Sequence, residues 1–250
     1  MSADVRVTRD GHVLRLTLAR VDKKNALTSA MYETLIAELQ RAETDPGVHV
    51  VLFEAEGGTF CAGNDLNDFA AVARGSVQAS ELKAYGFIQM LARATKPYVA
   101  AVQGAAIGIG TTLLLHCDLV YVAEDAILST PFVNLALVPE AASSLLLPAR
   151  VGHVRAYAMF ALGESIDGRM AANLGLANAA VPASEVRARA LAAAGELARR
   201  PLGALQATKR LMRDVQAIQA AMDREMQVFA ERLKSPEALA AIRRFMEGKG

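Results

Sequence analysis

The sequence predicts an α/β fold with mostly parallel strands. Two segments, 48–54 and 98–103, are almost continuously apolar and are bounded by turn residues, which is typical of strands buried on both faces. Helix-like segments alternate with such strands along the first half of the chain, and no long polar linker separates them. Because parallel strands are joined by crossovers that are usually helices, this alternation favours a parallel sheet.

Local signals justify each element of this α/β part. Residues 14–18 alternate between leucine and polar residues, as in a strand with one buried face. Thr28 can cap a helix whose apolar residues recur at helical spacing, and the Asp-Pro-Gly turn at 45–47 ends that helix. The pattern then predicts, in chain order, a strand over 48–54, a helix over 80–95, a strand over 98–103, a short helix over 109–116 and a strand over 119–123.

Helical patterns dominate after about residue 143. They cover 155–162, 184–199, 202–233 and 236–245, whereas 179–181 gives only a short strand signal. The apolar stripe along 202–233 is typical of a core or a subunit interface. We therefore divide the chain into an α/β core, residues 1–195, and a C-terminal helical region, residues 196–250.

The composition narrows the possible partners and the compartment. The formal net charge of +1 gives no support for binding nucleic acid or an anionic membrane surface. No apolar run reaches the roughly 18–20 residues of a membrane span. The two cysteines, Cys61 and Cys117, are too few for a disulfide framework and favour the reducing cytoplasm. The histidines have no metal-ligand spacing, so no metal site is expected.

Two glycine-containing turns are the most informative feature of the chain. One covers 58–66 and the other covers 104–110, and each follows a predicted buried strand and leads into a predicted helix. The first N–H groups of a helix lack intrahelical partners and carry the positive end of its dipole. Two such donors that converge on one oxygen form an oxyanion hole, which stabilises an enolate. We therefore expect chemistry at a carbonyl group.

Three other interpretations of these turns are weaker. Leu113 stands where a dinucleotide-binding turn needs its third glycine, and the Lys-Ser/Thr pair of a phosphate loop is absent. Cys61 has no apparent histidine partner and fits a small buried residue better than a nucleophile. The side chains of Asn64 and Asp65 are expected to cap the following helix, so a functional role of Asn64 would rest on its backbone N–H.

Several short motifs, in order and at consistent spacing, resemble one known family. They are Lys24-Asn25-Ala26-Leu27, the turn at 60–66, Ala101-Val102-Gln103-Gly104, Cys117-Asp118-Leu119 and the stretch 163–175. Together they resemble the crotonase (enoyl-CoA hydratase/isomerase) superfamily over essentially the whole chain. The resemblance implies a crotonase-like spiral of repeated β-β-α units. It also implies that residues 196–250 form a trimerisation region that covers an active site within 1–195, in a homotrimer or a dimer of trimers.

The same resemblance implies an acyl-CoA thioester as the substrate, with no metal and no separate cofactor. Members of the family stabilise a thioester enolate with two backbone N–H groups, which by position would be those of Asn64 and Ile109. By the same comparison, the substrate-binding residues would be Lys24, Ala26, Ala62, Asp65, Leu66, Gly108 and Phe132.

The acid–base residues indicate a branch of that family. Hydratases use two glutamates, and this chain has Thr112 and Phe132 at the matching positions. The Thr-Pro-Phe sequence at 130–132, followed by Pro-Glu-x-x-Ser-Ser at 139–144, resembles the Δ3,Δ2-enoyl-CoA isomerase branch. In that branch the glutamate that matches Glu140 is the single catalytic base.

One carboxylate is enough for such an isomerisation, whereas hydration usually needs two groups. A double bond moves from the 3,4 to the 2,3 position when one proton leaves C2 and one is added at C4. The apolar residues around Glu140 are expected to raise its pKa by desolvation. A hydratase or another enolate-forming acyl-CoA enzyme is the alternative, and a non-catalytic acyl-CoA-binding protein is the alternative from another class.

Overall fold

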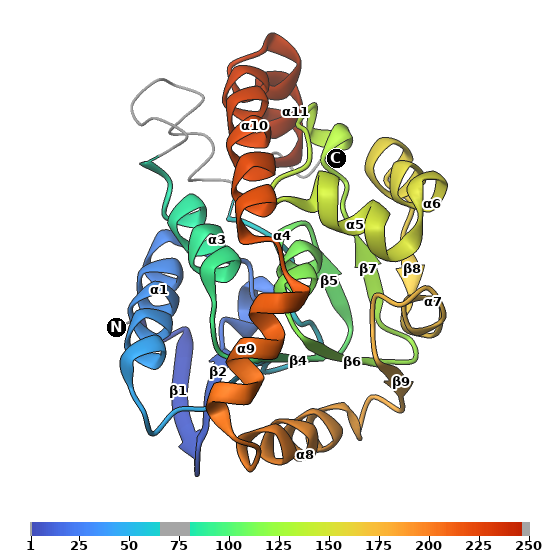
Figure 1. The fold of residues 1–250 in the computed structure, drawn as a ribbon. Coiled ribbons are helices and arrows are strands. Elements are labelled where there is room, and N and C mark those ends of the chain that lie inside the picture. Colours follow the sequence, from blue (N-terminus) through green and yellow to red (C-terminus); the bar gives the residue numbers. More distant parts are fainter. Residues whose placement is uncertain (1, 66–80, 247–250) are drawn as a thin grey trace.

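The computed structural model describes residues 2–65 and 81–246. Within these residues the larger sheet has six strands in the spatial order β1-β2-β3-β4-β6-β9. β1 is antiparallel to β2, and every other neighbouring pair in this sheet is parallel. The predicted α/β class is confirmed (Figure 1). The strands are β1 (Val5–Asp10), β2 (Val13–Leu18), β3 (Val50–Ala55), β4 (Tyr98–Val102), β6 (Leu119–Ala123) and β9 (Ala179–Val181).

The central strands are buried on both faces, as their sequences predict. Every residue of β3 and of β4 is buried. α8 (Val186–Ala198) packs against β3, β4 and β6, while α1 (Ser29–Thr44) packs against α3 (Lys83–Arg93) and reaches β1. An almost wholly apolar strand is stable in a parallel sheet because helices exclude water from both of its faces.

A second, small sheet follows β4 in the chain. It consists of β5 (Ala105–Ile107), β7 (Ile127–Ser129) and β8 (Ile166–Asp167), with β5 parallel to β7 and β7 antiparallel to β8. The sequence did not reveal these strands, because two or three residues are too few to show a recognisable alternation. α4 (Ile109–Thr112) begins shortly after β5 and continues as a 3-10 turn at Leu113–His116, so the helix expected over 109–116 is confirmed.

The single helix expected over 202–233 is wrong, because two helices cover that stretch. α9 (Leu202–Met212) and α10 (Val215–Leu233) are separated at Arg213, whose backbone is extended with φ −131° and ψ 116°. The Asp214 carboxylate then caps α10 by accepting a hydrogen bond from the Ala217 N–H at 2.9 Å. Two polar side chains make this break, and neither proline nor glycine marks it in the sequence.

The C-terminal helices pack on the segment that begins α5. α10 contacts α3, α5 and α11, and Figure 1 shows α10 and α11 rising together beside α5. The remaining elements of the described residues are α5 (Ser143–Val151), α6 (His153–Tyr157), a π-helical turn at Ala158–Leu162, α7 (Gly168–Asn173), α11 (Pro236–Met246) and 3-10 turns at Val21–Lys23 and Val133–Leu135.

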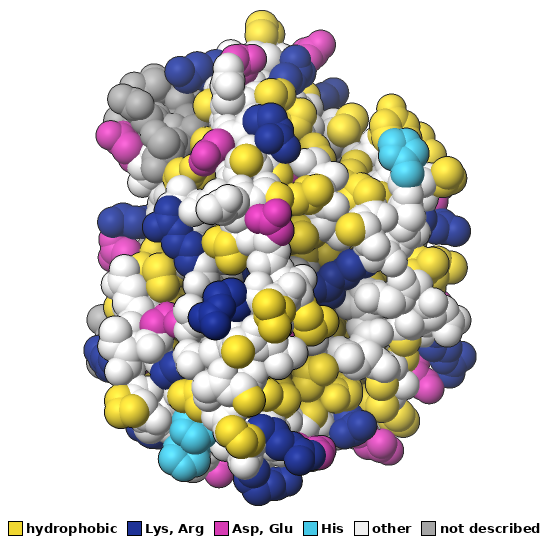
Figure 2. Space-filling view, viewed as in Figure 1, with side chains coloured by type: hydrophobic (Ala, Val, Ile, Leu, Met, Phe, Trp, Pro, Cys, Tyr) yellow, Lys and Arg dark blue, Asp and Glu magenta, His cyan; other side chains and the backbone are white. Residues whose placement is uncertain are grey.

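The surface carries charges of both signs. Lys and Arg side chains are interspersed with Asp and Glu side chains over the face shown in Figure 2, in keeping with the net charge of +1. Among the described residues, no helix combines the length and the apolar character that a membrane span requires.

Candidate active site

The two predicted glycine turns lie side by side. Cys61 and Ala106 form a short parallel bridge, in which the Ile107 N–H donates to the Cys61 carbonyl oxygen at 2.8 Å. A Cβ atom at Gly110 would lie 2.8 Å from that same carbonyl oxygen, so only glycine allows this close approach. Gly63 adopts φ +102°, a conformation that side chains disfavour, and it faces the Ile107 carbonyl. These contacts place the two turns side by side, and the convergence of their N–H groups on one oxygen stays a prediction.

The segment 24–27 pairs with the first turn and orders it. The Ala62 N–H donates to the Lys24 carbonyl at 3.0 Å, and the Leu27 N–H donates to the Gly63 carbonyl at 2.8 Å. The Asp65 N–H donates back to the Leu27 carbonyl at 2.8 Å. In this parallel ladder the amide of residue 64 points away from the segment 24–27, as alternate residues of a strand do.

The two turns carry the backbone N–H groups of Asn64 and Ile109, which the sequence predicts as donors. Within the described residues, no recorded hydrogen bond uses the N–H of Asn64 or of Ile109. Ile109 is the first residue of α4, where an N–H has no intrahelical partner. The preceding Gly108 has φ +56° and donates its own N–H to the Ser129 carbonyl at 2.9 Å, which fixes the start of the helix.

The side chains of Asn64 and Asp65 make contacts that anchor the first turn. The Tyr32 hydroxyl donates to Asn64 Oδ1 at 2.5 Å, and Asp65 forms an ion pair with Arg20 at 2.9 Å. Their expected role as caps of the following helix falls on residues outside the described part of the chain, and so does the candidate substrate-binding residue Leu66.

Glu140 lies against α4, the helix that begins at Ile109. The Thr112 hydroxyl, at the last residue of α4, donates to Glu140 Oε1 at 2.6 Å. Within the described residues no hydrogen bond engages the other carboxyl oxygen, Oε2. α4 therefore joins the Ile109 N–H, at its start, to the Glu140 carboxyl at its end.

Burial raises the pKa of Glu140 to about 8. The hydrogen bond from Thr112 opposes this rise by stabilising the charged form, whereas the negative charge of Glu225 adds to it. The expected direction of the shift is thus confirmed, and its main cause is desolvation, as the apolar flanking residues suggested.

The other candidate substrate-binding residues fall into two groups. Ala26 and Ala62 are half-buried and Lys24 is exposed, and all three lie on the paired segments beside Asn64. Phe132 is buried and lies in the segment after β7, with its ring centroid 6.2 Å from that of Phe160. None of the contacts of the described residues tests whether these side chains bind a substrate, so their binding roles remain predictions.

Two alternative chemistries find no support in the described part of the chain. Burial raises the pKa of Cys61 to about 12, so its thiolate is strongly disfavoured and a nucleophilic role is unsupported. No group of three or more His, Cys, Asp or Glu side chains among the described residues could hold a metal ion.

Sequence reasoning missed three residues that support Glu140. They are Thr112 as a hydrogen-bond donor, His116, which contacts the Ala141 carbonyl at 2.8 Å, and Glu225, which accepts hydrogen bonds from nearby backbone amides. Only Glu225 left a signal in the sequence, because it lies with Met222 and Phe229 on one helical face that is otherwise apolar and buried. A carboxylate on such a face needs a partner.

The chain is similar to proteins named as enoyl-CoA isomerases and hydratases. Residues 8–250 match the sequence model of a family described as enoyl-CoA hydratase/isomerase. Enoyl-CoA delta isomerase 2 of Rattus norvegicus is 32% identical over 99% of this chain, and the chain spans 64% of the length of that relative. The 2,3-dehydroadipyl-CoA hydratase of Escherichia coli K12 is 34% identical over 89% of this chain and 88% of its own length.

Solved structures repeat the same architecture over nearly the full chain. OdaA of Pseudomonas aeruginosa has a TM-score of 0.92 at 42% identity, and the match covers 98% of this chain and 99% of that one. An enoyl-CoA hydratase/isomerase of Pseudoalteromonas atlantica also has a TM-score of 0.92, at 37% identity, with 99% and 98% of the two chains covered.

Proposed function

The chain belongs to the enoyl-CoA hydratase/isomerase family and has its crotonase fold, and from that premise we propose that it isomerises 3-enoyl-CoA to 2-enoyl-CoA. The observation that carries the proposal is the contact between Glu140 and Thr112 at 2.6 Å, which sets one carboxyl at the end of α4. Thr112 and Phe132 occupy the positions where hydratases have their two glutamates, and neither can transfer the protons that hydration needs.

In the proposed reaction the thioester oxygen accepts hydrogen bonds from the N–H groups of Asn64 and Ile109. The Glu140 carboxylate removes a proton from C2. The electron pair of that C–H bond forms a double bond between C1 and C2, and the carbonyl electron pair moves onto the thioester oxygen, which gives a dienolate. The same carboxyl then returns a proton to C4, so the double bond shifts and the atom count is unchanged. A pKa of about 8 suits a group that both takes and gives a proton near neutral pH.

Glu225 lies near Glu140 but is a poor second acid–base group. Its two carboxyl oxygens accept hydrogen bonds from the N–H groups of Ala142 and Ser144 at 2.6 and 2.8 Å. Each oxygen of this carboxylate therefore already accepts one hydrogen bond from the backbone, which fixes the position of the side chain. Glu140 is then the one carboxyl of this pair that is open to substrate, which favours isomerisation over hydration.

The remaining features of the proposal follow the family. Lys24, Ala26, Ala62, Asp65, Leu66, Gly108 and Phe132 would contact the acyl-CoA, and no metal or separate cofactor would take part. We also propose assembly into a homotrimer or a dimer of trimers through residues 196–250, where the apolar side chains of Leu211 and Met212 on α9 are 87% and 83% exposed. Light scattering tests this assembly. The two buried free cysteines support placement in the cytoplasm.

The ultraviolet absorbance of a 3-enoyl-CoA solution tests the function directly. Addition of the protein should produce the absorbance of the conjugated 2-enoyl thioester, and Glu140→Gln should slow that rise by about 10²–10⁴-fold. Loss of a 2-enoyl-CoA signal in water without isomerisation would support the hydratase alternative. Acyl-CoA binding without turnover of either substrate would support the non-catalytic alternative, and a Glu140→Gln rate near that of the wild type would exclude Glu140 as the base.

A further inference from the structure

The backbone directly after Glu140 has an unusual conformation. Ala141 and Ala142 are consecutive residues with φ 58° and 56°, in the left-handed region that non-glycine residues rarely adopt. Both are buried, with 1% or less of their surface exposed. Such a conformation persists only where the surrounding structure holds it in place. The contacts of the single peptide group between these two residues show what holds it.

The N–H end of this peptide group is bound by Glu225. Glu225 Oε2 accepts a hydrogen bond from the Ala142 N–H at 2.6 Å, and Oε1 accepts one from the Ser144 N–H at 2.8 Å. Glu225 lies on α10 and is 8% exposed. The N-cap residue of α5, Ala142, has no side chain that can accept a hydrogen bond from the first N–H groups of the helix. The Glu225 carboxylate supplies that acceptor from α10.

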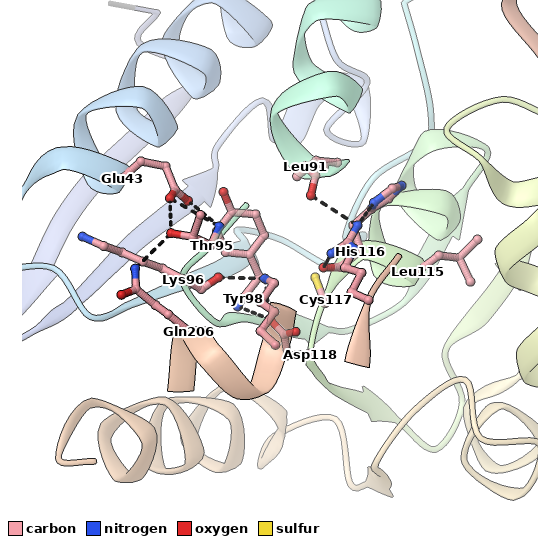
Figure 3. A network of polar contacts seen from close by, with 12 residues as sticks. Glu43, Leu91, Thr95, Lys96, Tyr98, Leu115, His116, Cys117, Asp118 and Gln206 are labelled. Carbon is pink, nitrogen blue, oxygen red and sulfur yellow. Dashed lines mark hydrogen bonds and ion pairs between the residues drawn. The ribbon is translucent and has the colours of Figure 1, made fainter. Parts of the chain in front are cut away.

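The carbonyl end of the same peptide group is bound by His116. The imidazole Nε2 lies 2.8 Å from the Ala141 oxygen, and because a carbonyl can only accept, Nε2 carries the hydrogen. Nδ1 is then the acceptor for the Arg213 guanidinium, at 2.5 Å. Arg213 also donates to the Leu91 carbonyl at the end of α3, and Figure 3 shows His116 below Leu91 in this network.

His116 stays neutral in this position. Burial lowers its pKa to about 3, and the positive charges of Arg213, Arg150 and Lys209 lower it further. A neutral imidazole has one donor and one acceptor nitrogen, which matches its two partners. The ring therefore keeps the same hydrogen bonds across the pH range in which Glu140 titrates.

We propose that His116 and Glu225 are positioning residues for Glu140, because they hold the oxygen and the N–H of the Ala141–Ala142 peptide group from opposite ends. This peptide group, like all peptide bonds of the described residues, is trans, so its oxygen and its hydrogen point in opposite directions. Rotation of the peptide plane would break both hydrogen bonds at once. We call these contacts of His116 and Glu225 with the Ala141–Ala142 peptide group the clamp. The clamp fixes the direction in which the chain leaves Glu140, and thereby keeps the Glu140 carboxyl beside Thr112.

This inference rests on the proposed function, in which Glu140 is the base. Its test begins with Glu225→Gln, which keeps the shape of the side chain but replaces one acceptor oxygen by a donor. Glu231→Gln is the matched control, because Glu231 is an exposed glutamate on the same helix. We expect kcat to fall by about 10- to 100-fold in Glu225→Gln, since a displaced base loses its alignment, while KM changes less than about twofold.

The pH profile separates positioning from simple loss of stability. The charged groups that face this carboxyl pair are Glu140 and Glu225 themselves and Arg224. Burial raises the pKa of Glu225, and its hydrogen bonds with Ser144 and Ala142 and the charge of Arg224 oppose that rise. Removal of the Glu225 charge should lower the pKa of Glu140, so the acidic limb of kcat/KM should move to lower pH. Glu225→Asp keeps the charge but is too short to reach both amides, so it should lose kcat without that movement.

The other end of the clamp has its own matched pair. His116→Gln keeps an N–H donor at the place of Nε2, whereas His116→Leu removes it. We expect the leucine variant to lose kcat and the glutamine variant to recover most of it. Equal kcat values in these two variants would overturn the role of His116.

An infrared titration of the Glu140 carboxyl, with Glu140→Gln as the blank, gives a readout that needs no turnover. The frequency of the Glu140 carboxyl band reports its hydrogen bond with Thr112. If the wild type does not isomerise 3-enoyl-CoA but His116→Leu and Glu225→Asp both shift that band, the proposed function fails and the clamp stands. If Glu225→Gln matches Glu231→Gln in kcat, pH limb and infrared titration, the clamp is wrong. A lower unfolding temperature with unchanged kcat and pH limb would also overturn it, because the role would then be structural only.

Discussion

The two sides of the candidate site are built in different ways. The donor side, which carries the proposed donors Asn64 N–H and Ile109 N–H, is held mainly by backbone hydrogen bonds, with side-chain contacts at Asn64 and Asp65 as well. The left-handed positions in its two turns are glycines such as Gly63 and Gly108. The base side carries the proposed base, Glu140. Its left-handed positions are alanines, Ala141 and Ala142, and side chains from other elements hold it in place. The donor side is therefore encoded locally, whereas the base side depends on the packing of the C-terminal helices.

The donor side should break most severely when its glycines are changed. Gly110→Ala would place a Cβ atom 2.8 Å from the Cys61 carbonyl oxygen and 2.9 Å from the Cys61 Cβ, so the two turns must move apart. Loss of one aligned oxyanion donor lowers kcat by about 10²–10³-fold. We expect a loss of that size in the isomerase assay, with the acyl-CoA affinity changed much less.

Gly203→Ala is the control for this substitution. Gly203 lies in α9 and has no atom within 4 Å of the place where a Cβ would stand, so the substitution should leave kcat unchanged. Equal activities of the two alanine variants would mean that the distance between the turns does not matter to the reaction.

The same contrast explains what could be predicted from the sequence. The apolar runs that became β3 and β4 are local signals with direct structural consequences, so the α/β class was predicted correctly. The glycines of both turns allow their close contact, while the convergence of their N–H groups on one oxygen stays a prediction. Glu140 was found through the resemblance to a family, since its flanking residues alone fit an exposed loop as well. The strands β5, β7 and β8 were missed because they are too short to show a period.

The residues that hold Glu140 in place could not be identified from local sequence patterns. His116 and Glu225 are 24 residues before and 85 residues after Glu140 in the chain, and only the folded arrangement shows that they share one peptide group. The break between α9 and α10 at Arg213 was missed for a related reason. The break coincides with a partly buried contact between Arg213 and His116 and with the cap by Asp214, not with a helix-breaking residue.

The base side should also carry a cost in stability that the donor side does not. The pKa of Glu140 rises from 4.5 to about 8 on folding, so between these values the folded chain binds more protons than the unfolded chain. Stability must then fall as the pH rises through this window. If Glu140 were fully buried, the free energy of unfolding would fall by about 5 kcal/mol across this pH window. Because Glu140 is partly exposed, we expect a fall of about 1–3 kcal/mol.

Glu140→Gln should remove this cost because glutamine does not ionise. The free energy of unfolding in urea should exceed that of the wild type by about 1–3 kcal/mol at pH 9, and the two proteins should differ much less at pH 5. Glu231→Gln should show no such pH-dependent difference. A wild type and a Glu140→Gln variant with parallel stability curves from pH 5 to pH 9 would contradict the raised pKa.

Thr112 links the two sides and gives the smallest expected effect. Its hydroxyl stabilises the charged form of Glu140, so Thr112→Val should raise the Glu140 pKa further and move the acidic limb of kcat/KM to higher pH. A hydrogen bond to a charged group contributes about 1.5–3 kcal/mol, which corresponds to about 1–2 pH units. Thr112→Ser keeps the hydroxyl, so its limb should stay near that of the wild type. If Thr112→Val and Thr112→Ser shift the acidic limb of kcat/KM equally, the packing of α4 rather than the hydrogen bond sets the Glu140 pKa. The base side would then depend on α4, the same helix that begins with the proposed donor Ile109.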